Sequence, residues 1–257
     1  MSIGIIIQAH MSSKRLSGKV LLNYKKYNIL KILIERLKGS FKNNKIIIAT
    51  TDNKIDDKIV NFCKKNEILY YRGSEKDVLS RYFGAAKHHK IKTIVRLTSD
   101  CPLIDMTTLS YMISIFKKHK VDFYSNTVPH PCKFPDGSDI EIFNFKTLNL
   151  TNTNAKLPSE REHVTFYMWK SKKFKIKKLN NNIDLSNYRY TVDYLKDFRL
   201  ICSMIDTFGK KIYKIGMKDV INYIDSNPSK IRYQKKLFRS IGWQKSLKKD
   251  KRYLQNI

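Results

Sequence analysis

The sequence is poor in cysteine, glycine and proline, and each scarcity excludes a class of protein. It contains four Cys, nine Gly and six Pro in 257 residues. The cysteines form no CxxC pair, so the sequence signals neither a disulfide scaffold nor a structural zinc site, and we expect reduced thiols. The low glycine and proline content excludes collagen-like and low-complexity sequence.

Long apolar runs are also missing. The run near the start centres on residues 5–7, far short of the roughly 20 residues that a membrane-spanning helix needs. Only Met1 and Ser2 precede the apolar segment, and they supply no basic region of the kind that begins a signal peptide. We therefore expect no membrane insertion and a cytoplasmic protein.

Acidic residues are scarce: 22 Asp and Glu stand against 51 Lys and Arg, a formal net charge of +29. The excess is densest in 210–257, which holds 14 basic and three acidic residues. Such a charge favours nucleic acid or a membrane surface as partner, or it is a lysine-rich solvated surface. The diffuse distribution favours the second interpretation.

Strand-like and helix-like segments alternate along the first half of the chain. The β-branched run at 3–9 is typical of a strand that is buried on both faces. Further strands are expected at 45–50, 68–71, 93–98 and 121–127. Helices are expected at 29–37, 55–63, 78–88 and 106–116. This alternation predicts an α/β fold with a doubly wound, mostly parallel sheet.

The second half is less regular. The segment 139–145 alternates like an exposed or hairpin strand, and further strands are expected at 173–179 and 188–192. Helices are expected at 161–170, 195–208, 218–224 and 230–249. We expect a domain at 1–209, with a small β-containing insertion at about 130–180 on the acceptor side or at a dimer contact. A basic helical appendage would then occupy 210–257.

The loop after the first strand, QAHMSSKRLSGK at 8–19, gathers hydroxyls and cations. A polar turn with free backbone N–H groups and basic side chains suits a polyphosphate. The loop lacks both GxxxxGK[ST] and GxGxxG. It is equally compatible with an ordinary basic surface loop.

Two aspartates, Asp100 in TSDCPLID and Asp193 in YTVDYLKDF, each end an expected strand. Carboxylates at the carboxyl ends of strands, facing a basic loop, favour a shared Mg²⁺ ion. For Asp100 alone, a turn or helix-capping role is an equal alternative.

These residues resemble one branch of the nucleotide-sugar cytidylyltransferases, the spore-coat polysaccharide biosynthesis type. That branch is related to the acylneuraminate and Kdo (3-deoxy-manno-octulosonate) enzymes. The segment IIIQAHMSSKRLSGKVLL is similar to the opening of those enzymes. Later motifs follow in the same order: RGSEKDVLSRY, VRLTSDCPLID, FPDGSDIEIFN, EREHVT, TVDYLKDF and SIGWQKSLKKD.

The resemblance implies a Rossmann-like fold of the nucleotide-diphospho-sugar transferase type, with C-terminal helices. It implies an enzyme that moves CMP from CTP to an acceptor, with Mg²⁺ as cofactor and pyrophosphate released. By motif position, the catalytic residues would be Lys19, Arg15 and Asp100, and the metal ligands Asp100 and Asp193. The nucleotide-binding residues would be Gln8, Ala9, His10, Ser13, Arg15, Lys19, Arg72, Ser74, Asp77 and Asp100. The acceptor-binding residues would be Asp136, Glu141, Arg161, Glu162 and His163.

Three positions depart from the family pattern: His10 stands in place of Arg, Ser17 in place of Pro, and Ser99 in place of Gly. We expect a cytidylyltransferase that takes an anionic acceptor, namely a sugar acid, a sugar or alditol phosphate, or a phosphonate. It would act in surface polysaccharide or glycoconjugate biosynthesis, as a homodimer. The alternative is a weakly active or inactive relative that binds anions or nucleic acid through its basic surface. The strand-end carboxylates argue against nucleic acid as partner.

Overall fold

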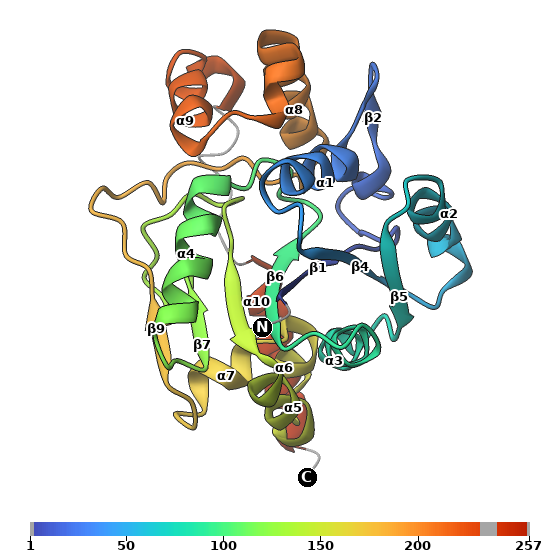
Figure 1. The fold of residues 1–257 in the computed structure, drawn as a ribbon, viewed down its shortest axis with the longest axis vertical. Coiled ribbons are helices and arrows are strands. Elements are labelled where there is room, and N and C mark those ends of the chain that lie inside the picture. Colours follow the sequence, from blue (N-terminus) through green and yellow to red (C-terminus); the bar gives the residue numbers. More distant parts are fainter. Residues whose placement is uncertain (1–2, 232–240, 256–257) are drawn as a thin grey trace.

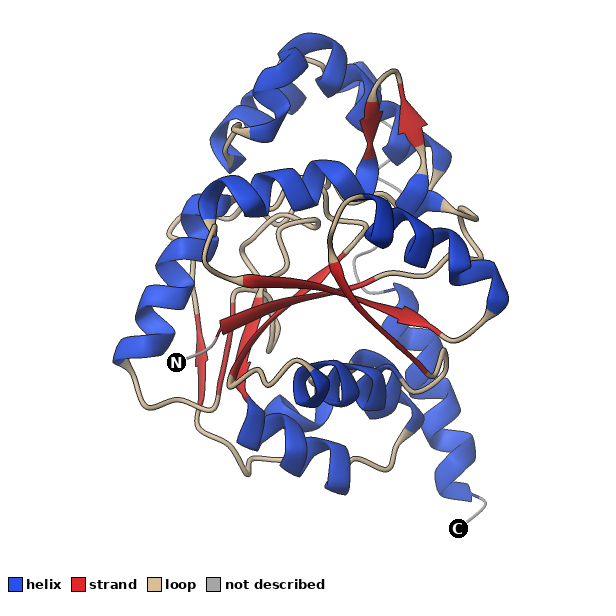
Figure 2. Ribbon diagram, turned by 45° about the vertical axis from the view of Figure 1, so that its right-hand side comes forward, coloured by secondary structure: helices blue, strands red, loops and turns tan. Residues whose placement is uncertain are grey.

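A seven-stranded sheet with helices on both faces forms the centre of the molecule (Figure 2). The computed structural model describes residues 3–231 and 241–255. The strands lie in the order β5 (Leu69–Gly73), β4 (Lys45–Thr51), β1 (Ile3–Gln8), β6 (Thr93–Thr98), β8 (Glu141–Asn144), β7 (Phe123–Ser125) and β9 (Ile176–Lys178). Within this sheet β8 pairs antiparallel with β6 and β7, and the other pairings are parallel. The predicted doubly wound, mostly parallel Rossmann-like sheet is confirmed.

The β-branched run in β1 is explained by burial on both sides of the sheet. Ile5 and Ile7 pack into one hydrophobic cluster, and Ile6 packs into another. Successive side chains of a strand point to opposite faces, so both faces of β1 need apolar residues. The same alternation holds in β4, where Ile46 and Ile48 face one cluster and Ile47 faces the other.

Helices from three segments cover each face of the sheet. The first face packs against α1 (Ile29–Ser40), α2 (Asp57–Lys65) and α4 (Met106–Lys118). The second packs against α3 (Val78–His88), α5 (Phe145–Asn154) and α7 (Phe166–Lys170). None of the helices in the described ranges has the length and apolar composition to cross a membrane.

A separate hydrophobic cluster joins the later part of the chain to α1. It contains residues of α8 (Leu195–Phe208) and α9 (Met217–Asp225), together with Ile29 and Ile32 of α1. The short hairpin of β2 (Asn23–Tyr24) and β3 (Tyr27–Asn28) packs beside it. Helix α1 is therefore buried both toward the sheet and toward α8 and α9 (Figure 1).

The segment expected to form one appendage, 210–257, divides between two places. Helix α9 lies with α8, whereas α10 (Ile241–Gln255) packs against α6 (Pro158–His163), far from α9 in Figure 1. The expected helix at 230–249 falls partly on 232–240, outside the described residues. The domain boundaries remain a prediction.

Three sequence-based expectations about local structure were wrong. The segment 188–192 forms no strand but one isolated bridge between Arg189 and Asp136, because its apolar residues pack into the α8–α9 cluster instead of pairing along a ladder. Of the two alternatives for 139–145, the exposed strand is wrong, since β8 lies buried between β6 and β7. Its antiparallel pairing with β7, the strand before it, is that of a hairpin strand. The helix expected at 161–170 is two short helices, α6 and α7, separated at Val164, which has a φ of 64°.

A candidate active site at the ends of two neighbouring strands

The carboxyl ends of β1 and β6 lie side by side where the strand order reverses direction along the chain. In open α/β sheets, ligands bind at this position. Lys19 follows β1, Asp100 follows β6, and Asp193 precedes α8. The Lys19 Nζ lies 2.7 Å from Asp100 Oδ2 and 2.8 Å from Asp193 Oδ1. The fold thus joins three residues that the motifs singled out.

Of the alternative roles for Asp100, helix capping is not observed, whereas Asp100 does lie in a turn. The N-cap of α4 is Asp105, whose carboxylate accepts from Thr108 N. The carboxylate of Asp100 instead accepts a hydrogen bond from the Lys19 ammonium. Its side chain is placed by a short turn in which Cys101 N donates to Thr98 O.

Two arginines complete the ionic network around Asp193. Arg15 donates to Asp193 Oδ1, and Arg189 NH2 lies 2.9 Å from Asp193 Oδ2. Arg189 also pairs with Asp136 and lies 3.4 Å from Asp197 Oδ2. Three cations therefore meet four carboxylates in a largely buried cluster. The sequence reading missed Arg189 and Asp197, although Arg189 stands four residues before Asp193 in the motif RYTVD.

The charges in this network stabilise one another. Burial alone would lower the pKa of Lys19, but Asp100 and Asp193 outweigh burial and raise that pKa. Burial alone would raise the pKa of Asp193, but Lys19 and Arg15 hold it well below its usual range. Lys19 is therefore an ammonium, and Asp193 a carboxylate, at neutral pH.

Gly137 brings Asp136 into the network. Its φ of 113° is in a region that favours glycine, and a Cβ there would lie 2.7 Å from Thr191 N. The loop can therefore run against 188–192, where Asp136 N donates to Tyr188 O and Tyr190 N donates to Asp136 O. These bonds set Asp136 beside Arg189.

The loop after β1 is held by hydrogen bonds near both of its ends, whereas backbone N–H groups in its middle are unpaired within the part of the chain that the structure describes. Met11 N donates to the buried Asp56 carboxylate at 2.6 Å, and Gly18 N donates to Met11 O at 2.9 Å. Gly18 adopts a left-handed conformation immediately before Lys19. Among the described residues, the backbone N–H groups of 12–15 have no hydrogen-bond acceptor. This arrangement offers N–H groups beside basic side chains, which suits an anion.

His10 and Ser13 lie in this loop, and Ala9 at its start is buried, with its N–H bonded to Ala49 O in β4. The His10 Nδ1 is 2.9 Å from Ser12 Oγ. Burial first, and then the nearby Arg81 guanidinium, lower the pKa of His10, so it is neutral at neutral pH. The imidazole at position 10 therefore adds no positive charge to the loop at neutral pH.

Glu75 links three loops that follow neighbouring strands, and it was not among the predicted site residues. Its carboxylate accepts from the hydroxyl of Ser12 and from Asn53 Nδ2, the latter at 2.7 Å. The only sequence signal was its place in the motif RGSEKD. Glu75 therefore connects the loop after β1 to those after β4 and β5.

Gln8 and Glu141 meet through Arg96, a cation in the otherwise uncharged strand β6. Arg96 NH2 lies 3.0 Å from Gln8 Oε1, and Arg96 NH1 pairs with Glu141. Glu141 also accepts from Thr165 Oγ1 at 2.7 Å. The sequence signal that could have identified Arg96 was an arginine within an otherwise uncharged, buried strand.

Arg72, Ser74, Asp77 and Arg161 hold protein segments together. Arg72 donates to Thr51 O and Asn53 O, both at 2.9 Å, and pairs with Asp57. Ser74 Oγ accepts from Asp77 N at 3.0 Å. Asp77 caps α3 and accepts from Arg161 Nε at 3.0 Å. Contact of these residues with a nucleotide or an acceptor stays a prediction.

Glu162 and His163 contact α10. His163 Nε2 lies 2.9 Å from Ser246 Oγ, and Glu162 Oε2 lies 2.9 Å from Lys249 Nζ. The His163 ring stacks on Phe166 with centroids 4.7 Å apart. Their expected role at the acceptor is likewise a prediction, and the contacts observed join α6 to α10.

The burial of His163 where α6 contacts α10 predicts that the folded protein loses stability in acid. Burial lowers the pKa of His163 to about 4 from an ordinary value of 6.5. The unfolded chain takes up this proton near pH 6.5 and the folded chain does not, so the folded state loses stability as the pH falls from 6.5 toward 4. We expect the free energy of unfolding to drop by about 2–3 kcal/mol from this histidine by pH 4.

Urea unfolding at a series of pH values measures this loss. His163→Gln should unfold with a clearly weaker pH dependence over the same range, whereas His119→Gln, at an exposed position, should behave like the wild type. An unchanged pH dependence in His163→Gln would contradict the assignment.

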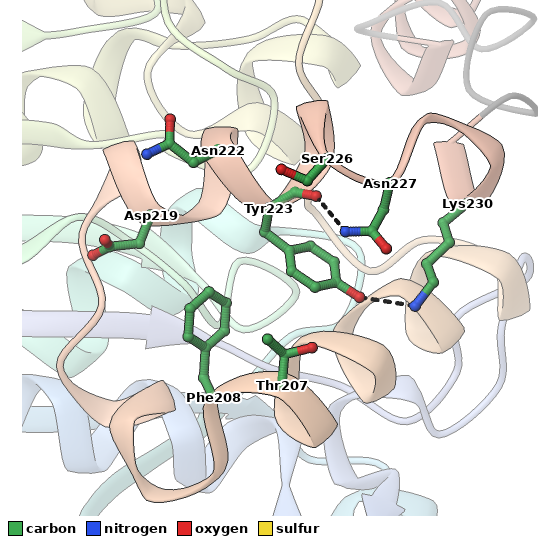
Figure 3. A pocket seen from close by; sticks show the side chains of 8 residues that line it. All are labelled: Thr207, Phe208, Asp219, Asn222, Tyr223, Ser226, Asn227 and Lys230. Carbon is green, nitrogen blue, oxygen red and sulfur yellow. Dashed lines mark hydrogen bonds between the residues drawn. The ribbon is translucent and has the colours of Figure 1, made fainter.

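A hollow of about 390 Å³ lies between α8 and α9 (Figure 3). Tyr223 lines it, with its hydroxyl 2.9 Å from Lys230 Nζ and its backbone oxygen 2.8 Å from Asn227 Nδ2. None of its lining residues belongs to the cluster around Lys19. The strand-end network, and not this hollow, contains the predicted catalytic and metal-binding residues.

Sequence and structure comparisons agree on the family. A sequence profile described as Cytidylyltransferase matches residues 4–241. A solved cytidylyltransferase from Leptospira borgpetersenii is 38% identical, with a TM-score of 0.85 over 93% of this chain and 100% of that one.

Two curated proteins extend the comparison. The spore coat polysaccharide biosynthesis protein SpsF of Bacillus subtilis is 29% identical over 87% of this chain and 94% of its own. A 3-deoxy-manno-octulosonate cytidylyltransferase of Fusobacterium nucleatum is 25% identical over 75% of this chain and 73% of its own. This protein belongs to the cytidylyltransferase family and is a nucleotidyltransferase.

Proposed function

We propose that this protein transfers CMP from CTP to an anionic acceptor and releases pyrophosphate. The acceptor would be a sugar acid, a sugar or alditol phosphate, or a phosphonate, used in surface polysaccharide or glycoconjugate biosynthesis. The observation that carries the proposal is the convergence of Asp100 and Asp193 on one cationic group beside the loop after β1. The names of the relatives, a spore-coat polysaccharide protein and a sugar-acid cytidylyltransferase, support the acceptor class.

The residues fit a divalent cation, with Mg²⁺ as the proposed ion. No group of three or more His, Cys, Asp or Glu suited to a metal occurs in the described ranges. Two carboxylate oxygens do converge on the Lys19 ammonium, which occupies the place proposed for the metal ion. The triphosphate would supply further oxygen ligands. A divalent cation held there would neutralise charge on the phosphate that reacts.

The loop after β1 would bind the triphosphate. The N–H groups of 12–15 and the side chains of Arg15 and Lys19 supply donors and positive charge. Gln8, Ala9, His10 and Ser13 would lie along the nucleoside and phosphates. The base would extend toward the loop after β5, which holds Arg72, Ser74 and Asp77.

The reaction needs positioning and charge neutralisation more than covalent catalysis. An oxygen of the acceptor attacks the α-phosphorus of CTP and forms the new P–O bond. The bond from that phosphorus to the bridging oxygen breaks, and its electron pair leaves on pyrophosphate. Arg15 and Lys19 would stabilise the charge that develops on this leaving group.

Asp136 is the predicted acceptor residue that lies within the ionic network, through Arg189. Glu141 lies in the network of Arg96 and Gln8. Binding of the acceptor by Asp136, Glu141, Arg161, Glu162 and His163 belongs to the proposal. So do a homodimeric state and a cytoplasmic location.

The test is an assay of pyrophosphate release with CTP, Mg²⁺ and a panel of acceptors from the three classes. Release is expected only when both CTP and an acceptor are present, with a CMP conjugate as the second product. A failure to release pyrophosphate with any acceptor, together with tight and salt-sensitive binding of nucleic acid, would support the alternative of an inactive basic binding protein.

A further inference from the structure

Lys19 occupies the position that a metal ion would take between the two strand-end carboxylates. Its side chain is 7% exposed, and its Nζ is bonded to an oxygen of each aspartate. Asp193 Oδ1 also accepts from Arg15, and Asp193 Oδ2 accepts from Arg189. In this arrangement both oxygens of Asp193 already face cations.

A divalent cation cannot use both carboxylates while Lys19 remains between them. It would have to lie within a few ångströms of a buried ammonium, and like charges at that distance repel strongly in a poorly solvated site. Lys19 must leave before a metal binds there. A free metal ion brings no negative group to receive this ammonium, whereas a metal–nucleotide complex brings a triphosphate.

We propose that Lys19 makes the carboxylate pair selective for a metal–nucleotide complex over the free metal ion. In the free protein Lys19 is the counter-ion of Asp100 and Asp193. When the complex binds, Lys19 moves to the phosphates and the carboxylates become ligands. This inference rests on the proposed function only in taking these two aspartates as the metal ligands.

The surroundings of Lys19 allow this exchange. The ammonium lies at the end of a long flexible side chain, close to the loop whose N–H groups at 12–15 are open. Arg15, the second cation on Asp193 Oδ1, has a side chain 37% exposed and is also near the loop. Both cations can therefore turn from a carboxylate to a phosphate without a change in the sheet.

Binding of Mn²⁺ without nucleotide, followed by the electron paramagnetic resonance signal of the free ion, tests the proposal. The wild-type protein should bind Mn²⁺ weakly. Lys19→Met, which keeps the length of the side chain but not its charge, should bind at least tenfold more tightly. Lys19→Arg should bind as weakly as the wild type. Lys14→Met loses the same charge from an exposed position of the loop and should also match the wild type.

Two further measurements make the result specific. Adding Asp193→Asn to Lys19→Met should abolish the gain in affinity, because the carboxylate pair is then broken. Thermal unfolding of each variant with Mn²⁺ and without it reports folding and binding in the same sample. Mn²⁺ should raise the unfolding temperature of Lys19→Met more than that of the wild type.

Equal or weaker Mn²⁺ binding by folded Lys19→Met would overturn the proposal. So would tight binding of Mn²⁺ by the wild-type protein without nucleotide, a result that needs no variant. Either result can occur while CMP transfer is intact, so this inference can fail separately from the proposed function.

Discussion

Asp100→Asn is expected to lower kcat at least a hundredfold. The substitution keeps the shape of the side chain but removes one of the two charges that would hold the metal. A metal ion stabilises the charge of a transition state by several kcal/mol, and each 1.4 kcal/mol corresponds to about tenfold in rate. Steady-state release of pyrophosphate at saturating CTP and Mg²⁺ measures the effect.

Asp206→Asn is the matched control for this variant. Asp206 lies on α8 and forms an exposed ion pair with Lys25, apart from the network around Lys19. It undergoes the same chemical change and should keep wild-type turnover. Full Mg²⁺-dependent turnover by Asp100→Asn would show that Asp100 is not a metal ligand in the reaction.

Arg36→Met is expected to lower the free energy of unfolding by about 3–5 kcal/mol. Arg36 is 1% exposed and donates to Ile212 O, Ile104 O and Ile215 O at 2.7, 2.9 and 2.8 Å. Burial lowers its pKa to about 10, so it is charged at neutral pH. Methionine fills the space but leaves these three carbonyl groups without the arginine donors.

Urea unfolding of Arg36→Met beside the wild type measures this loss. Lys38→Met, on the exposed side of the same helix, should change stability by less than about 0.5 kcal/mol. A loss below about 1 kcal/mol in Arg36→Met would mean that other groups or water satisfy the three carbonyls. Arg36 would then not be the link between α1 and the segment after α8.

The sheet was predictable because its signal is local. The runs in β1, β4 and β6 consist of residues that suit a strand buried on both faces, and each is separated from the next by a helical pattern. The segment 188–192 has a similar composition but forms no strand. Burial, not pairing, selected its residues, and a sequence pattern does not separate the two causes.

The candidate site was predictable only in part, for a related reason. Lys19, Asp100 and Asp193 were found because each stands in a motif at the end of a predicted strand. Arg189 and Arg96 were missed, since their partners come from distant segments. Arg189 meets Asp136 where two loops cross, and Arg96 lies opposite Glu141 in the register of β6 against β8. Glu75 lies within the motif RGSEKD, but its partners Ser12 and Asn53 belong to other loops, which the motif alone does not indicate.

By itself, the sequence determined the sheet, the polar and basic composition of the loop after β1 and the family, because period, composition and motif order are properties of neighbouring residues. Tertiary structure alone decided the pairing of the charges. It set one ammonium between two carboxylates that are 93 residues apart in the chain, and it joined Arg161 to Asp77 and Glu162 to Lys249. The reason is that Coulomb attraction and desolvation depend on distance and burial, which exist only once the chain has folded.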